Sequence, residues 1–301
     1  RWTPDGQRNQ FHMQRLKSKL GNRSNASGEV EFAGAWAQRV GPEGRGVATI
    51  IEMVLHTRLD CVMGTAALMR QGLVQAIHHA RHRGAFGHLL IDQPLMQNVL
   101  ADLALESEAA TLLMLRLARA FDQRHSDPHE HGIARLATAI GKYWISKRGP
   151  AHLAEALECL GGNGYVEESI LPRLYREAPV NSVWEGSGNV ICLDILRAMR
   201  KEPDAVHSLL HEIQLARGAD PRFDAWSERI ERDLKHAATE VEARSLAERL
   251  ALSLQASLLI RHSIPAVAGA FCASRLSENR GHAFGTLPPQ TDFAAIFARA
   301  F

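Results

Sequence analysis

From Gly46 onward, apolar residues recur at three- and four-residue steps over long runs. The runs cover about 46–83, 93–121, 133–160 and 187–201. This spacing places the apolar side chains along one face of a helix. Four long amphipathic helices joined by short or medium loops are typical of an antiparallel four-helix bundle.

The segments on either side of these runs have a different character. Residues 1–45 are rich in Gly and Pro, and the alternating piece Glu29-Val30-Glu31-Phe32 indicates a strand. A compact β unit needs three or more strands, and this stretch supplies barely two, so we interpret it as the remnant of a β domain. Helical runs at about 204–216, 223–239, 241–262 and 292–300 follow the bundle. The sequence therefore predicts a mainly α chain with domains at 1–45, 46–202 and 203–301.

Composition excludes several classes of protein. Of the 301 residues, 46% are apolar and 23% are charged, which is typical of globular chains and excludes wholesale disorder. No apolar stretch approaches the roughly 20 residues that span a bilayer, so we expect no membrane partner. Four scattered cysteines favour a reducing, cytoplasmic setting. His207 and His211 share a helix face without further ligands at suitable spacing, so we expect no metal site.

The segment from Leu160 to Asn189 contains the residues best suited to chemistry. In it, Glu185 is followed by the small residues Gly186, Ser187 and Gly188 at the start of a helical run. A carboxylate in such a place can approach a ligand closely as a general base, and the free N–H groups of the helix favour an electron-rich ligand. A structural alternative fits the same residues, with Ser187 as the helix N-cap and Glu185 solvated.

The extension offers a second class of function. Downstream of Ala243, six arginines stand against three acidic residues, whereas 201–301 as a whole has 12 basic and 13 acidic residues. Clustered arginines can bind nucleic-acid phosphates in bidentate fashion. A solvated helix surface explains the same composition equally well.

Three motifs occur in order along the chain. They are Arg83-Gly84-Ala85-Phe86-Gly87 with Gln93 beyond it, Leu160-Gly161-Gly162-Asn163-Gly164-Tyr165, and Trp184-Glu185-Gly186-Ser187-Gly188-Asn189. Over about residues 15–200 these motifs resemble the C-terminal half of the acyl-CoA dehydrogenase family of flavoproteins. Residues 15–27 and 57–61 and the helical region after Lys201 resemble its AidB-type alkylation-response subgroup. The resemblance implies the family's C-terminal fold, with the N-terminal helical domain and nearly all of the middle β domain missing from this chain.

The resemblance also implies an FAD site, incomplete in this chain. Glu185 matches the base that removes the α-proton of an acyl thioester while a hydride passes to the flavin. Thr57 stands where isovaleryl-type relatives carry an alternative catalytic Glu, and Arg58 matches an arginine near the substrate. The positions matching FAD contacts are Arg83, Phe86, Gln93, Gly161 and Gly162, which serve a neighbouring subunit, and Val183, Trp184, Ser187, Gly188, Asn189 and Leu193.

The AidB-type resemblance implies partners as well. We expect double-stranded DNA to bind the C-terminal region, a role in the adaptive response to DNA alkylation, at most weak isovaleryl-CoA-type dehydrogenase activity, and a homotetramer built as a dimer of dimers. The expected DNA contacts are Arg197, Arg200, Lys201, Arg244, Arg249, Arg261 and Arg280. Two alternatives are an ordinary FAD-dependent dehydrogenase of a short or branched acyl-CoA, and a truncated, inactive helical scaffold.

Overall fold

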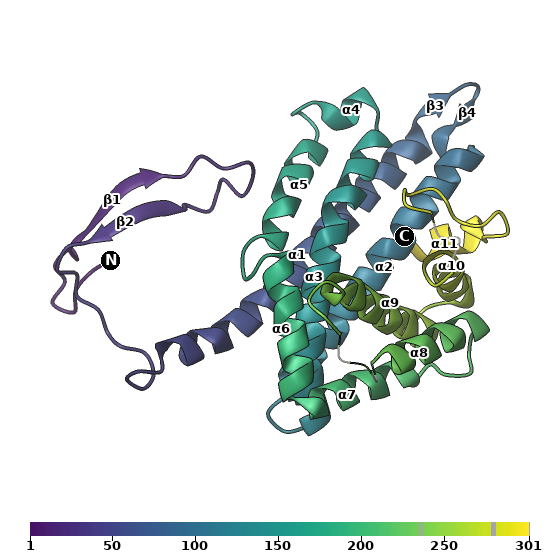
Figure 1. Cartoon of the computed structure of the whole chain (residues 1–301). Coiled ribbons are helices and arrows are strands. Elements are labelled where there is room, and N and C mark those ends of the chain that lie inside the picture. The colour runs from purple at the N-terminus through teal and green to yellow at the C-terminus, as the bar shows by residue number, and fades with distance from the viewer. Residues whose placement is uncertain (235, 237, 278–280, 301) are drawn as a thin grey trace. The chain divides into compact units, whose positions relative to one another are not determined.

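The structure is a computed structural model that describes residues 1–234, 236, 238–277 and 281–300. Its contacts divide the chain into two compact units, residues 1–54 and 55–301 (Figure 1). The mainly helical fold with a short β segment in front, predicted from the sequence, is confirmed. No helix in the described ranges is long and apolar enough to cross a membrane.

The first unit contains a two-stranded antiparallel sheet. Strand β1 (Phe11–Leu16) pairs with β2 (Gly28–Phe32), and the register shifts between Met13 and Arg15. Large apolar side chains of this unit are exposed, including those of Leu16 and Phe32. Because these side chains are exposed, the sheet has no buried core of its own. A two-stranded sheet without such a core is only marginally stable in water.

Four long helices form the bundle. They are α1 (Gly46–His82), which begins in the first unit, α2 (Pro94–Gln123), α3 (Pro128–Glu158) and α6 (Gly188–Lys201). Helix α3 packs against both α2 and α6. Gly72 and Gly149 let α1 and α3 approach closely, because an added Cβ would lie 2.7 Å from Leu153 and 2.5 Å from Thr65. The antiparallel bundle predicted from the apolar periodicity is therefore present.

Short elements connect these helices. Strands β3 (Gly84–Ala85) and β4 (His88–Leu89) and the 3-10 helix η1 (Leu90–Asp92) lie between α1 and α2. Helices α4 (Gly162–Tyr165) and α5 (Leu171–Glu177) and the 3-10 helix η2 (Ala178–Ser182) lie between α3 and α6. Figure 1 shows β3, β4 and α4 at the end of the bundle that lies away from α7.

The beginning of α3 differs from the prediction. The predicted run begins at about residue 133, whereas residues 127–131 form the N-cap and first turn of α3. Pro128 is the first helical residue, and the carboxylate of Asp127 accepts a hydrogen bond of 2.8 Å from the N–H of His129. The predicted start was too late because it followed the apolar periodicity, whereas Asp followed by Pro is itself a helix-start signal.

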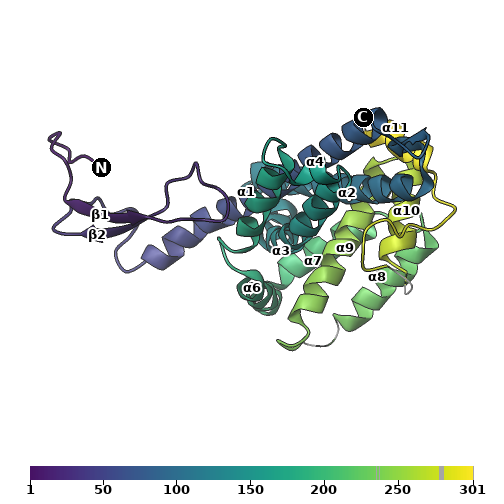
Figure 2. The same cartoon turned by 90° about the horizontal axis from the view of Figure 1, so that it is seen from above.

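Five helices form the described part of the extension beyond residue 202. They are α7 (Pro203–Gln214), α8 (Pro221–Asp233), α9 (Ala243–His262), α10 (Pro265–Arg275) and α11 (Phe293–Ala300). Helix α9 packs against α2, α3, α6 and α7, and Figures 1 and 2 show α8 to α11 gathered on one side of the bundle. The extension therefore shares the core of the bundle within one compact unit.

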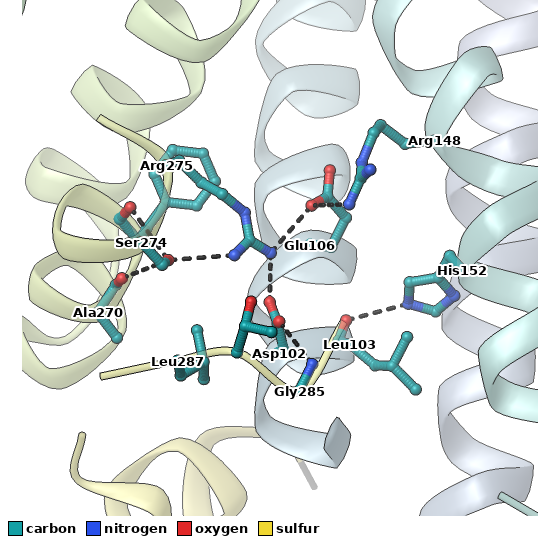
Figure 3. A network of polar contacts seen from close by, with 12 residues as sticks. Asp102, Leu103, Glu106, Arg148, His152, Ala270, Ser274, Arg275, Gly285 and Leu287 are labelled. Atoms are coloured by element: carbon teal, nitrogen blue, oxygen red, sulfur yellow. Dashed lines mark hydrogen bonds and ion pairs between the residues drawn. The ribbon is translucent and has the colours of Figure 1, made fainter. Parts of the chain in front are cut away.

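A buried ionic network joins the extension to the bundle (Figure 3). Arg275 of α10 donates hydrogen bonds to Asp102 and Glu106 of α2, and Arg148 of α3 donates to Glu106 at 3.2 Å. The two carboxylate side chains are only 1% and 3% exposed. Burial alone would raise the pKa of Glu106, but Arg148 and Arg275 outweigh burial and hold this pKa at about 2. Both carboxylates are paired with arginine, as buried charges must be.

Candidate functional site

Glu185 lies in a strained turn just before α6. Its φ of +59° is in the left-handed region, and Gly186 follows with φ +107°. Among the described non-glycine residues, only Asn22 and Phe86 share a positive φ with Glu185. This conformation costs on the order of 1 kcal/mol for a residue with a Cβ, and it persists only where surrounding contacts hold it.

Two buried cations supply those contacts. Lys142 Nζ donates to the carbonyl oxygens of Trp184 (2.9 Å) and Gly186 (2.5 Å). Arg58 Nε donates to the carbonyl oxygen between them, that of Glu185, at 3.2 Å. Three consecutive carbonyl groups are thus held by side chains from α1 and α3.

Arg58 is held from its other side. Its guanidinium pairs with Asp194 of α6 at 2.5 Å, and Arg135 of α3 also pairs with Asp194, at 3.2 Å. The sequence predicted Arg58 as a substrate residue, and the structure places it, nearly buried, against the main chain of the Glu185 turn. Asp194 and Arg135 were not predicted at all.

Lys142 was also missed, although the sequence carries a signal for it. It lies in an apolar helical run, two residues after Ile140 and three before Ile145, and its side chain is fully buried. Burial and the nearby Arg58 lower its pKa to about 8, whereas the negative charge of Glu185 acts in the opposite direction. Burial also raises the pKa of the neighbouring Cys61 thiol to about 11, which keeps this thiol neutral at physiological pH.

The first turn of α6 contains further predicted residues. Ser187 is at the N-cap position, but its side chain makes no capping hydrogen bond in the described structure, so the capping alternative lacks its expected bond. The side-chain oxygen of Asn189 accepts a 2.9 Å hydrogen bond from Arg244 Nε of α9. A Cβ at Gly188 would lie 3.1 Å from Lys147 and 3.2 Å from Arg244. Two cations therefore flank the start of α6.

The other predicted cofactor residues lie on different elements. Phe86, in the β3–β4 turn, is 96% exposed, and Arg83 beside it is also exposed. Gln93 Nε2 donates to the carbonyl oxygen of Ala85 at 2.9 Å. Among the described residues, Gly161 and Gly162 have open space around them, since no neighbouring atom lies within 4 Å of a Cβ added at either position. These residues belong to β3, β4, α4 and the residues beside them, at one end of the bundle, whereas Val183 to Leu193 belong to the Glu185 turn and α6 (Figure 1).

The arginines predicted to contact DNA fall into two groups. Arg197, Arg200, Lys201 and Arg244 are exposed. Arg249 pairs with Asp233 at 2.5 Å, and Arg261 pairs with the buried Glu212 at 2.5 Å. Arg280 lies outside the described residues. The described part of the chain contains no group of three or more His, Cys, Asp or Glu side chains that could hold a metal ion.

Known proteins share this fold and sequence. A model of the acyl-CoA dehydrogenase C-terminal domain matches residues 44–200. The putative acyl-CoA dehydrogenase AidB of Escherichia coli (strain K12) is 47% identical over 93% of this chain and 52% of its own length. The crystal structure of Caenorhabditis elegans ACDH-11 in complex with C11-CoA is similar with a TM-score of 0.83 and 28% identity, over 93% of this chain and 53% of that one.

A more distant structure shows the fold alone. The acyl-CoA dehydrogenase of Bacillus anthracis complexed with FAD is similar with a TM-score of 0.68 and 17% identity, over 96% of this chain and 56% of that one. The chain spans about half the length of these relatives. With its family model covering more than half of the sequence, this chain belongs to the acyl-CoA dehydrogenase family.

Proposed function

We propose that the chain is the C-terminal part of an AidB-type, FAD-containing acyl-CoA dehydrogenase in which Glu185 is the catalytic base. The carrying observation is the turn at Glu185, which buried cations hold in a conformation of elevated energy. Such strain clusters at functional sites, where it pre-organises a reacting group. The carboxylate would take the α-proton of an acyl thioester. FAD, when bound, supplies the acceptor for the hydride.

The residues around the turn fit such a cofactor. Val183, Trp184 and Leu193 expose apolar surface next to the turn, and a flat ring system can pack on such a surface. The hydroxyl of Ser187, without a capping bond, and the first N–H groups of α6 provide hydrogen-bond donors. Arg83, Phe86, Gln93, Gly161 and Gly162 would contact the flavin of a neighbouring subunit, which requires a homo-oligomer.

The test is anaerobic addition of isovaleryl-CoA to the full-length flavin-loaded protein. We expect the visible flavin absorbance to bleach, and Glu185→Gln to slow the bleaching by at least about 100-fold, as for loss of a general base. Glu168→Gln, a change of an exposed glutamate outside the turn, is the matched control and should bleach at the wild-type rate. Equal rates for Glu185→Gln and wild type would remove Glu185 as the base.

We also propose an association with double-stranded DNA in the response to DNA alkylation. The specific observation is the set of exposed cations on the last turns of α6, Arg197, Arg200 and Lys201, with Arg244 exposed on α9. Among the described residues, none of these four takes part in an ion pair within the chain. Exposed cations without an internal counter-ion can release solution counterions when they contact phosphates.

Salt dependence tests this second proposal. We expect duplex binding to weaken with salt, and Arg197→Ala with Arg200→Ala to make the log–log slope shallower by about two, because each of these arginines would neutralise one phosphate. Arg70→Ala, at an exposed position on α1, is the control. Bleaching without duplex binding would favour the ordinary dehydrogenase, and the absence of both would favour the scaffold.

A further inference from the structure

We propose that Lys142 is a positioning residue for Glu185, acting through the main chain of the turn. The inference rests on the proposed function and deepens it. Lys142 touches neither the carboxylate nor any position assigned to substrate. It bonds the peptide group before Glu185 and the peptide group after Gly186, and the conformation of the turn between these groups determines where the carboxylate points.

Lys142 connects two peptide groups of the turn. A single nitrogen atom, Lys142 Nζ, bonds the carbonyl oxygens of Trp184 and Gly186, one on each side of Glu185. These two bonds fix the peptide plane that precedes Glu185 relative to the one that follows Gly186, so together they constrain the backbone torsions of Glu185 and Gly186. Without them, Glu185 can leave the left-handed region for an ordinary conformation, and its side chain then points elsewhere.

The ammonium group of Lys142 is buried without a carboxylate partner among the described residues. Lys142 is 1% exposed, and among the described residues its hydrogen-bond acceptors are these two carbonyl oxygens, with no carboxylate within ion-pair distance. A buried ammonium without a counter-ion is costly, and an apolar side chain of similar volume would serve packing better. Lys142 therefore stabilises the conformation of the turn and does not add to the stability of the core.

Arg58 and Lys142 make different contacts with the turn. Arg58 bonds the carbonyl oxygen of Glu185 itself but is oriented by Asp194 of α6. Arg58 belongs to α1, and its ion pair with Asp194 connects the turn to α6. Lys142 connects the turn to α3. The two cations therefore bond different carbonyl groups of the turn, and Arg58 cannot replace the two bonds of Lys142.

The experiment compares Lys142→Met with wild type by two measurements. In hydrogen exchange of the purified chain, we expect faster exchange across residues 183–190. In anaerobic reduction of the full-length flavoprotein by isovaleryl-CoA, we expect the limiting rate to fall roughly 10- to 100-fold, the size of effect for a reacting group displaced by about 1 Å. The half-saturating concentration should change less than about threefold, since substrate binding is untouched.

Controls make the outcomes distinct. His152→Leu changes another fully buried residue of α3 and should leave exchange at 183–190 unchanged even where it lowers stability. Lys142→Arg keeps the donors and the charge and should recover part of the rate. If Lys142→Met does not fold, Lys142→Arg and Lys142→Gln take its place, with Gln, which is uncharged and shorter, slower than Arg.

Two results overturn different claims. Flavin reduction that survives Glu185→Gln removes the proposed function and leaves the exchange result standing. Flavin reduction that depends on Glu185 but proceeds at the wild-type rate in Lys142→Met, with unchanged exchange at 183–190, removes the role of Lys142 alone.

Discussion

His152 on α3 is a fully buried histidine whose protonation opposes folding. Its Nε2–H donates to the carbonyl oxygen of Leu103 at 3.0 Å (Figure 3), and its Nδ1 is buried with no hydrogen-bond partner in the described part of the chain. Burial lowers its pKa from 6.5 to about 4. Between these two values the unfolded chain binds a proton that the folded chain does not, so stability falls as pH falls through this window.

We therefore predict that His152→Leu reduces the acid sensitivity of folding. The free energy of unfolding of the wild type should drop between about pH 7.5 and about pH 5, with about 2 kcal/mol of the drop due to His152. Urea unfolding at the two pH values measures this difference in each variant. His131→Leu changes an exposed histidine of the same helix and should leave the difference as in wild type. An unchanged pH difference in His152→Leu would contradict the prediction.

At the same scale, the sequence pointed to Glu185 and Arg58 but not to Lys142, which also holds the turn. Glu185 stands in a run of small residues before a helical run, a pattern visible in one stretch of sequence. Lys142 bonds main-chain oxygens 42 and 44 residues away, and a carbonyl group carries no side-chain identity that a sequence could reveal. The available signal was a charged residue in an apolar run, which shows burial but not its partner.

At the scale of secondary structure, apolar periodicity predicted the long helices well. Helix α2 (94–123) and α6 (188–201) lie within a few residues of the predicted runs. Helix α10 was not predicted, because the predicted runs of the extension leave residues 263–291 without a helix. In the structure Pro265 is the first residue of α10, where its missing N–H costs nothing. Periodicity identifies helix interiors, and proline marks a boundary without saying on which side the helix lies.

The ionic network predicts how strongly α10 is attached to α2. Arg275→Met would leave Asp102 and Glu106 buried with Arg148 as the remaining cation near them. We expect a decrease of about 3–5 kcal/mol in the free energy of unfolding, since a broken buried pair leaves an uncompensated charge. Denaturant unfolding followed by circular dichroism measures this decrease.

A surface pair on the neighbouring helix provides the comparison. Arg299 of α11 pairs with Glu108 of α2 at 3.2 Å, but its side chain is 45% exposed. Arg299→Met should cost less than about 1 kcal/mol, because solvent screens exposed pairs. Adding Asp102→Asn to Arg275→Met should restore part of the stability by removing one unpaired charge. Equal costs for Arg275→Met and Arg299→Met would show that burial does not decide the strength of these pairs.

At the scale of the whole molecule, exposed apolar side chains bear on assembly. Phe86, in the turn that joins β3 and β4, is 96% exposed. Leu95, in the first turn of α2, is 84% exposed, and Tyr165 of α4 is 79% exposed. Apolar surface gathered in this way is typical of an interaction site. We predict a homotetramer for the wild type, and a smaller assembly for Leu95→Asp, by light scattering coupled to size exclusion.

A second leucine on the same helix is the control. Leu115, toward the other end of α2, is 54% exposed and should tolerate Asp without a change of mass. The same mass for wild type, Leu95→Asp and Leu115→Asp would exclude this end of the bundle as an assembly surface.

Composition alone could not decide which arginines of the extension are available to a partner. Arg249 and Arg261 count towards the basic tail in the sequence, yet in the structure each is paired with a carboxylate. Asp233 and Glu212, which pair with them, come from α8 and α7, earlier in the extension. Net charge counts residues along the chain, whereas availability depends on partners that only the folded chain brings together.

The hydrogen bond between Arg244 and Asn189 has a further consequence. It joins the first turn of α9 to the first turn of α6, so one of the exposed cations contacts a residue of the proposed cofactor site. A phosphate that draws Arg244 away also releases the amide of Asn189. Because linked equilibria are reciprocal, any factor by which duplex DNA then weakens flavin binding is the factor by which flavin weakens DNA binding. Through this contact, a ligand bound at one proposed site would change the affinity of the other.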